Sequence, residues 1–322
     1  VKDRGSFLVA GRASYAHLFL EFTDNENSAY FYDLNTKLSY RLNDNNSIYL
    51  SGYFGRDVFT INKSFVNTYG NSVFNLRWNH LFSDKLFSNL SLIYSDYYYG
   101  LDLDFVGFKW DSGIKNYNIK YDFKSYISDK FKLNYGANGI YYNFNPGTIK
   151  PSDENSGINF GQLDKKYAFE PAVYINADQE ISNKISISYG LRLSLFYRLG
   201  QSTMNIYEDN NPVTFNSDLQ IYEKATPIGT KFYAKNKVIE NFNNLEPRFS
   251  FAYQLNDNQS VKASYNRMVQ YLQLISNTSS PTPLDVWTPS DSFIKPQIAD
   301  QVALGYFRNF KDDKYSVEIE TF

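Results

Sequence analysis

The stretch Ile185-Ser186-Ile187-Ser188-Tyr189-Gly190-Leu191-Arg192-Leu193-Ser194-Leu195-Phe196-Tyr197 decides the fold. Its odd-numbered positions are all apolar, and small or polar residues occupy most of the even-numbered ones. Because side chains alternate between the two faces of a β-strand, the stretch predicts a strand with one apolar and one polar face. It is longer than the five or six residues common in globular sheets, and it suits a tilted strand that crosses a bilayer.

The same alternation recurs along the chain. It is clear in 30–42, 74–79 and 117–123, where apolar residues occupy most of the alternate positions. Counting all such segments predicts about thirteen antiparallel strands in an all-β, up-and-down transmembrane barrel. Bacterial single-chain barrels close with an even number of strands, so an odd count indicates part of a larger barrel.

The connections between these segments alternate in length. Short polar turns are predicted at Asn43–Asn46, Ser83–Lys85, Ser128–Lys130, Ser182–Lys184, Asn256–Gln259 and Lys311–Asp313. Long loops are predicted at about Asp57–Asn71, Gly100–Gly113, Asn145–Lys165, Leu199–Asn243 and Met268–Lys295. Short turns at one end and long loops at the other are typical of outer-membrane barrels, in which the short turns are periplasmic and the long loops extracellular.

Composition supports a membrane β-structure. The 322 residues include 29 Tyr and 27 Phe, yet the mean hydropathy is −0.47, which is too polar for a helical membrane protein. No run approaches the roughly 18 apolar residues of a spanning helix. Tyrosines at strand ends, namely Tyr94, Tyr97, Tyr98, Tyr99, Tyr141 and Tyr142, are expected to form an aromatic girdle at headgroup level.

A β-sandwich is the alternative for a chain of alternating strands, and it would turn the apolar faces inward. Strand length and the one-sided distribution of long loops both argue against it. Without cysteine the chain has no disulfide or thiol site, and its net charge of −2 gives no reason to expect nucleic-acid binding.

The sequence offers no catalytic, cofactor or metal site. Its two histidines, His17 and His80, each lie in a strand-like segment with no partner at ligand spacing, and both are interpreted as wall residues. Neither a nucleophile elbow nor a glycine-rich phosphate loop is present. We therefore expect no enzyme.

Two segments near the end carry a family resemblance. Asn244-Leu245-Glu246-Pro247-Arg248, the turn Leu255–Asn258 and Val261–Arg267 resemble a strand, turn and strand of TonB-dependent outer-membrane receptors. Phe293–Gln297 followed by Asp300–Gly305 is similar to another strand entry of that family, with Ile294, Gln297 and Gln301 departing from its usual residues. Gly52–Asp57 and Trp287–Ser290 further resemble the Bacteroidetes branch.

The resemblance implies a barrel of about twenty-two strands, an N-terminal plug domain and a segment that engages the energy-coupling protein TonB. Residues 1–322 would then form one partial barrel domain, with the plug, the coupling segment and the final strands outside it. The implied activity is ligand-gated, energy-coupled import of a scarce nutrient such as a metal chelate, a cobalamin-like cofactor, a glycan or a peptide. The implied surroundings are outer-membrane lipid.

Candidate ligand contacts fall into two groups. The basic residues expected in the lumen are Arg77, Arg192 and Arg248, and the aromatic residues expected in the long loops are Tyr207, Tyr222, Tyr233, Tyr271 and Trp287. Aromatic rings can stack on a sugar or a catecholate, but they can equally pack the loops against one another.

Three other functions remain open at this stage. A passive porin fits the wall pattern equally well, and an adhesin barrel would use its loops without transport. An outer-membrane phospholipase would need a serine and histidine pair, which the sequence does not place.

Overall fold

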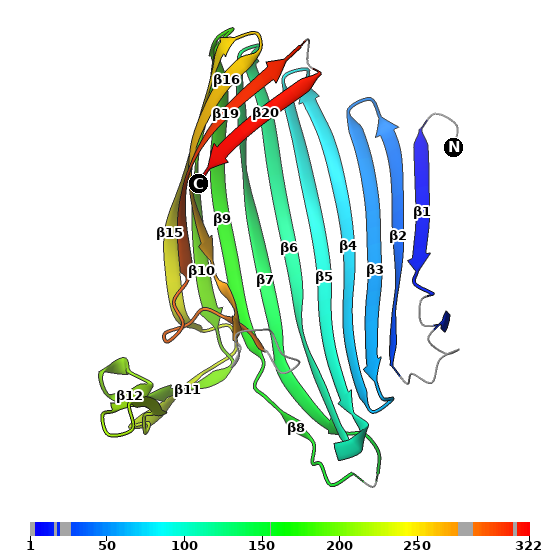
Figure 1. Cartoon of the computed structure of the whole chain (residues 1–322), viewed down its shortest axis with the longest axis vertical. Coiled ribbons are helices and arrows are strands. Elements are labelled where there is room, and N and C mark those ends of the chain that lie inside the picture. The colour runs from blue at the N-terminus through cyan, green and yellow to red at the C-terminus, as the bar shows by residue number, and fades with distance from the viewer. Residues whose placement is uncertain (1–3, 16–17, 20–26, 155, 276–285, 312–313) are drawn as a thin grey trace.

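The computed structural model describes residues 4–15, 18–19, 27–154, 156–275, 286–311 and 314–322. Thirteen strands pair antiparallel in one curved sheet, each beside the next main strand along the chain, as Figure 1 shows. They are β1 (Gly5–Ala13), β2 (Ser28–Asn43), β3 (Asn46–Ile61), β4 (Phe65–Ser83), β5 (Leu86–Leu103), β6 (Phe108–Ser128), β7 (Phe131–Pro151), β9 (Lys166–Ser182), β10 (Ile185–Leu199), β15 (Val238–Asn256), β16 (Gln259–Gln270), β19 (Gln297–Phe310) and β20 (Tyr315–Thr321). The predicted all-β meander of about thirteen strands is confirmed.

The two faces of the sheet differ as the alternation predicts. One row across five strands is wholly apolar and consists of Leu38, Leu50, Leu76, Leu92 and Ile119. Most of this row is exposed, on what we call the outer face. The next row, on the opposite face, runs through Ser39, Tyr49, Arg77, Ser91 and Lys120. We call this polar, concave side the inner face.

A single sheet with an exposed apolar face is not a sandwich. A β-sandwich would cover the row of leucines with a second sheet. Here the small ladders outside the main sheet contain only two strands each. The apolar outer face is therefore free to contact lipid, which is the arrangement of a barrel wall.

Short turns join the strands at one end. Two-residue turns link β2 to β3, β4 to β5, β6 to β7, β9 to β10 and β15 to β16, as predicted. The residue before each turn often supports it, since Asn43 Oδ1 accepts a hydrogen bond from the Asn45 amide at 3.0 Å and Ser182 Oγ accepts one from the Lys184 amide at 3.2 Å. Of the sixth predicted turn, residues 312–313 lie outside the described residues.

Two of the predicted long loops are wrong. Strands β3 and β4 extend through Asp57–Asn71 and leave only residues 62–64 between them. Asn62 and Lys63 adopt φ of 48° and 54°, which suits a tight hairpin. Strands β5 and β6 likewise extend through most of Gly100–Gly113, joined by the short 3-10 helix η1 (Asp104–Val106) and Gly107. No helix in the described part of the chain is long and apolar enough to cross a membrane.

The other three predicted long loops are confirmed as long connections between wall strands, and each contains short strands. Residues 152–165 include β8 (Gly161–Gln162), which pairs with β7. Residues 200–237 form a projecting unit of two small ladders, β11 (Ser202–Ile206) with β14 (Gly229–Tyr233) and β12 (Val213–Asn216) with β13 (Ile221–Lys224), and also contain η2 (Glu208–Asn210). Residues 271–296 contain β17 (Leu272–Ile275) paired with β18 (Val286–Pro289), while 276–285 lie outside the described residues.

The predicted tyrosine girdle is only partly correct. Tyr94 pairs with Tyr117 on the outer face, with ring centroids 5.2 Å apart. Tyr99 and Tyr142, in contrast, are buried in apolar clusters on the inner face. Consecutive tyrosines in a strand point to opposite faces, so a run of them cannot all reach the lipid.

Candidate functional site

The inner face carries an ion-pair network at the middle of the wall, centred on Arg192 of β10. Arg192 Nε lies 3.6 Å from Glu246 Oε1 of β15, and its Nη2 lies 4.0 Å from Glu170 Oε1 of β9. Tyr142 donates a hydrogen bond to Glu170 Oε2 at 3.0 Å, and the guanidinium carbon lies 5.8 Å from the centre of the Tyr174 ring. The network joins four adjacent strands.

Tyr271 anchors the 271–296 connection above this network. Its ring is 3% exposed and stacks on Phe196, with centroids 4.7 Å apart and planes 3° apart. Its hydroxyl lies 2.7 Å from Ser194 Oγ and accepts a hydrogen bond from Asn244 Nδ2 at 2.9 Å. Burial raises the pKa of the Tyr271 hydroxyl, which therefore stays neutral near pH 7.

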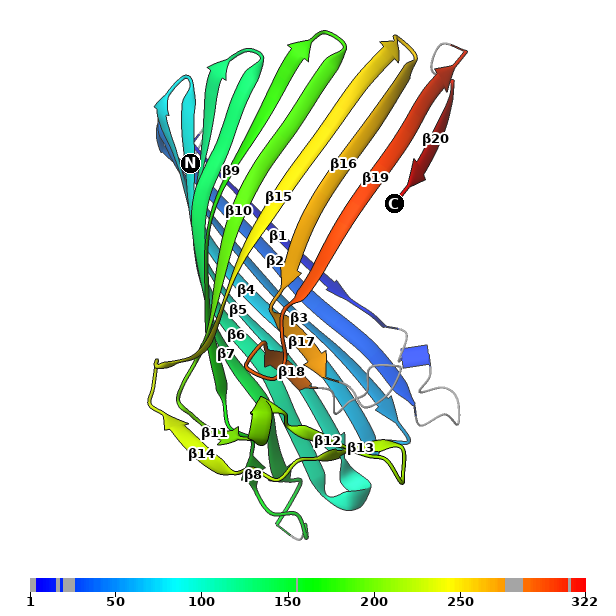
Figure 2. The same cartoon turned by 90° about the vertical axis from the view of Figure 1, so that its left-hand side faces the viewer.

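The β17–β18 hairpin packs against the inner wall. Figure 2 shows it inside the curve of the sheet, and Trp287 of β18 packs against the cluster that contains Tyr271 and Phe196. Lys166 of β9 donates a hydrogen bond to Thr288 Oγ1 at 2.7 Å. Of the eight predicted site residues, Arg192, Tyr271 and Trp287 are thus brought to one region of the inner face.

The other three loop tyrosines lie in the projecting unit. Tyr222 is 73% exposed and contacts Phe215 across the β12–β13 ladder, with centroids 5.1 Å apart. The Lys231 ammonium lies 4.9 Å from the centre of the Tyr233 ring. Tyr207 is buried edge-on against Phe293 at 5.6 Å. Figure 1 shows the ladder of β12 and β13, the strand that contains Tyr222, projecting beyond the edge of the main sheet.

The remaining basic candidates are spread along the inner face. Arg77 of β4 stacks on Tyr49 of β3, with its guanidinium carbon 4.7 Å from the ring centre. Arg248 of β15 stands opposite Gly190 and Asn266 in the ladders, two positions from Glu246. The three arginines therefore share a face but do not form one cluster.

His80 lies on the outer face near the turn end. Its Nδ1 is 2.8 Å from Asn46 Oδ1, and its ring meets Phe82 edge-on at 4.3 Å. This position is that of a wall residue, as expected. His17 lies outside the described residues.

Sequence reasoning missed the acidic partners and one buried arginine. Glu170 and Glu246 were not identified because their pairing with Arg192 depends on the register of three strands. Arg198, 1% exposed, donates hydrogen bonds to the carbonyl oxygens of Tyr167, at 3.0 Å, and Leu199. Arg198 and Arg192 both occupy even-numbered positions of β10, which face inward. The alternation of this strand could therefore have identified Arg198 as an inner-face residue.

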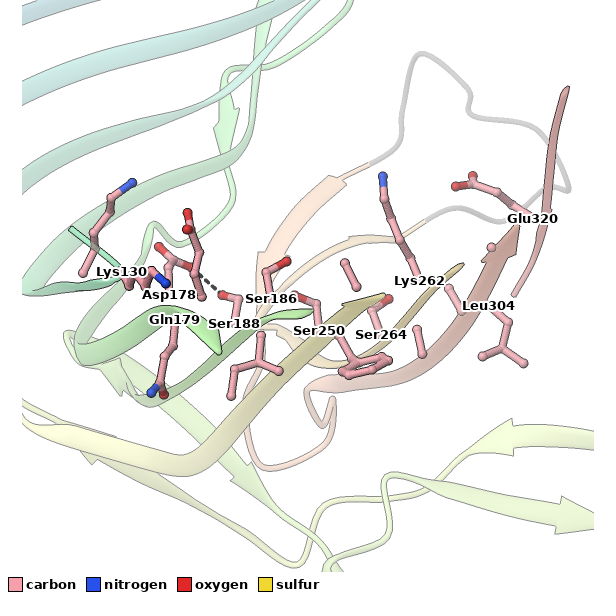
Figure 3. Close-up of a pocket in the computed structure, with 18 of the residues that line it drawn as sticks. Lys130, Asp178, Gln179, Ser186, Ser188, Ser250, Lys262, Ser264, Leu304 and Glu320 are labelled. Carbon is pink, nitrogen blue, oxygen red and sulfur yellow. Dashed lines mark hydrogen bonds between the residues drawn. The ribbon is translucent and has the colours of Figure 1, made fainter. Parts of the chain in front are cut away.

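A second feature of the inner face is a hollow of about 410 Å³ near the turn end, shown in Figure 3. It spans β9, β10, β15, β16, β19 and β20 and is floored by small side chains, among them Ser186, Ser188, Ser250 and Ser264. Ser188 donates a hydrogen bond to Asp178 at 2.7 Å, and Lys262 and Glu320 project at its far side. The hollow offers hydroxyl and charged groups to a polar partner.

The described residues contain no group of three His, Asp or Glu side chains that could hold a metal ion. The inner face thus provides paired charges around Arg192, further arginines spread along the strands, and packed aromatic rings. These properties suit a wall that surrounds a plug or a solute.

Comparison with known proteins shows the fold. No family model and no curated protein matches the sequence. Among solved structures, one match is a double mutant of the Serratia marcescens hemophore receptor HasR in complex with its hemophore HasA and heme. This match has a TM-score of 0.65 at 14% sequence identity, and it covers 96% of this chain and 48% of that one.

Two further solved structures match in the same way. The closed form of the ferric-catecholate import receptor Fiu from E. coli K12 matches with a TM-score of 0.63 at 12% identity, over 99% of this chain and 54% of that one. The copper transporter OprC matches with a TM-score of 0.62 at 12% identity, over 96% and 47%. The chain spans about half the length of these structures, and its sheet has the fold of part of a TonB-dependent receptor barrel.

Proposed function

We propose that this chain is part of the barrel wall of a TonB-dependent transporter in a bacterial outer membrane, and that it is not an enzyme. The long strands, the apolar outer face and the two-residue turns at one end support this location. The 13-strand match to receptors such as HasR and Fiu carries the proposal. The two-residue turns would be periplasmic and the β11–β14 unit extracellular.

The inward-packed β17–β18 hairpin favours a gated transporter over a passive porin. It is held on the inner wall by Tyr271 and by the contact from Lys166 to Thr288. A hairpin on the inner wall would narrow the lumen and would offer a segment that a ligand can displace. In this proposal a plug domain and a TonB-binding segment elsewhere in the protein couple the import to energy.

The ligand class stays open among a metal chelate, a cofactor, a glycan and a peptide. The matched structures are a hemophore receptor in complex with heme, a ferric-catecholate receptor and a copper transporter. We propose that Arg77, Arg192 and Arg248 face the transported ligand, and that Tyr222 and Tyr233 meet it first at the surface. Tyr207, Tyr271 and Trp287 are assigned to positioning the loops, because they are packed in this structure. The Bacteroidetes assignment is supported by Gly52–Asp57 and Trp287–Ser290.

The test is uptake by cells with and without the gene. Labelled ferric chelates, heme, cobalamin, oligosaccharides and peptides are supplied before and after collapse of the proton gradient. We expect the deletion strain to lose accumulation of one ligand. Wild-type cells should lose accumulation of the same ligand once the proton gradient has collapsed. Normal uptake of every ligand would refute import, and uptake that survives collapse of the gradient would favour a porin.

A further inference from the structure

The outer face changes character toward the loop end of β3–β7. On β5 the outward positions Leu90, Leu92 and Tyr94 are followed by Asp96 and Tyr98. Asp96 stands ten positions beyond Leu86, where the strand begins. Ten residues of a strand tilted by roughly 40° rise about 25 Å, which is the height of the apolar band of such barrels. The polar row therefore starts where the lipid headgroups are expected.

A hollow of about 440 Å³ lies in this polar zone. The register places Arg56, Gly70, Tyr98 and Gly113 in one row across four strands. A Cβ on Gly113 would lie 2.3 Å from the backbone oxygen of Tyr97, so no side chain fits there. Gly70 leaves room for the Arg56 side chain, whose Nε lies 3.6 Å from the position that a Cβ on Gly70 would take.

The charges in the hollow do not balance. Asp96 pairs with Lys115 at 3.2 Å, and Asp111 accepts hydrogen bonds from Lys150 at 2.5 Å and Tyr98 at 2.8 Å. Both carboxylates are therefore occupied. Arg56 and Lys165 also line the hollow, and neither forms an ion pair with any described residue.

Arg56 is the group that lacks a partner most clearly. Its guanidinium carbon lies 5.3 Å from the centre of the Tyr98 ring, which fixes the side chain against the wall. Its buried Nε has no hydrogen-bond partner in the described part of the chain. A buried donor without a partner is costly, and the guanidinium also carries two Nη groups, whose fork matches the oxygens of a phosphate.

We propose that this hollow binds the phosphate of a lipid headgroup in the outer leaflet, with Arg56 as the principal ligand and Lys165 as a second cation. The proposal rests on the outer-membrane location given under the proposed function. The hollow continues the lipid-facing surface directly above the Tyr94 and Tyr117 rings, so the acyl chains of the same lipid would lie along the apolar rows below it. Position and charge together favour a lipid-borne phosphate over a free one.

The experiment is native mass spectrometry of the full-length protein in detergent, titrated with diphosphorylated lipid A. The variants are Arg56→Gln, Arg56→Lys and the control Arg267→Gln. Arg267 also lies on the outer face, but both its Nε and Nη2 donate to Asp300, at 2.7 and 2.8 Å. The control makes the same change in net charge without removing a free guanidinium.

Arg56→Gln is expected to weaken lipid retention about tenfold, as the loss of one charge-assisted contact implies. Arg56→Lys should keep part of the affinity, and Arg267→Gln should match the wild type. The proposal is overturned if dephosphorylated lipid is retained equally well, if Arg56→Gln binds like the wild type, or if inorganic phosphate binds while the lipid does not. Because the assay does not measure uptake, its failure would leave the transport proposal intact, and failed uptake would leave the lipid result standing.

Discussion

At the scale of single residues, Tyr271 joins parts of the chain that are 77 positions apart. Its hydroxyl contacts Ser194 of β10 and Asn244 of β15, and its ring covers Phe196. These contacts determine whether the β17–β18 hairpin stays on the wall.

Replacing Tyr271 with alanine should release the hairpin. Two hydrogen bonds and a ring stack together contribute about 2 kcal/mol, so the Leu272–Ile275 amides should exchange with solvent roughly thirtyfold faster. Hydrogen–deuterium exchange with mass spectrometry measures this. Tyr271→Phe should have a smaller effect, and Tyr222→Ala, at an exposed position, none. Unchanged exchange in Tyr271→Ala would show that the hairpin is held by other contacts.

Arg192 gives a second prediction. Arg192→Gln leaves Glu170 and Glu246 close together without a cation, which should lower the free energy of unfolding by about 2 to 3 kcal/mol. Urea unfolding of the full-length protein from lipid vesicles provides the measurement. Adding Glu246→Gln should recover part of the loss, and strictly additive effects of the two changes would refute the coupling.

The sequence predicted the face on which a residue lies whenever the alternation within its own strand was sufficient. The phase of β10 identified Arg192 as an inner-face residue, because alternation needs only local sequence. Its partners Glu170 and Glu246 follow from the register of neighbouring strands, and a slip of one residue would turn either carboxylate to the other face. The Tyr271 contact depends on folding a distant connection, for which no periodicity exists.

At the scale of elements, the two ends of the strands should be on opposite sides of the membrane. An epitope tag between Ser217 and Asp218, in the β12–β13 turn, should be stained by antibody on intact cells. The same tag between Asp129 and Lys130 should be stained only after permeabilisation. Staining of both tags on intact cells, with an intact outer membrane confirmed by a periplasmic marker, would contradict the orientation.

The faces of β10 should differ in their tolerance of charge. Leu193→Arg places a guanidinium among lipid chains and should cost about 2 to 4 kcal/mol, whereas Ser186→Arg on the inner face should cost much less. Heat-modifiability on gels reports the folded fraction of each variant. Equal folding of the two variants would show that the outer face does not meet lipid.

The loop prediction failed at 57–71 and 100–113 for a physical reason. Above the apolar band the outer face of β3–β6 becomes polar, as at Arg56 and Asp96, while the inner face carries apolar residues such as Tyr99. The apolar phase thus changes from one face to the other, and the alternation followed from the first half of the strand ends. The backbone ladder nevertheless continues, because hydrogen bonding between strands does not depend on which face is apolar. Five of the six predicted turns, by contrast, are confirmed, because Asn, Asp and Ser stabilise turns locally.

At the scale of the whole molecule, β1 and β20 each pair on one side only within the described sheet. Residues 1–322 produced alone should therefore associate through these strands. Light scattering after detergent refolding should show oligomers or aggregates, and the full-length protein should be monomeric. A stable monomer of residues 1–322 would show that the two edges are satisfied within the chain.

The strands are not equally tall. From β4 to β7 they run for 18 to 21 residues, whereas β10, β16 and β19 have 12 to 15, although β15 between β10 and β16 has 19. Strands β4–β7 stay hydrogen-bonded to one another up to their loop ends, so bending this part of the wall inward would break many hydrogen bonds at once. The connections after β10 and β16 carry two-stranded ladders that are separate from the main sheet, so moving one of them breaks fewer ladder hydrogen bonds. We therefore expect the rim formed by β4–β7 to resist bending more strongly than the connections that follow β10 and β16.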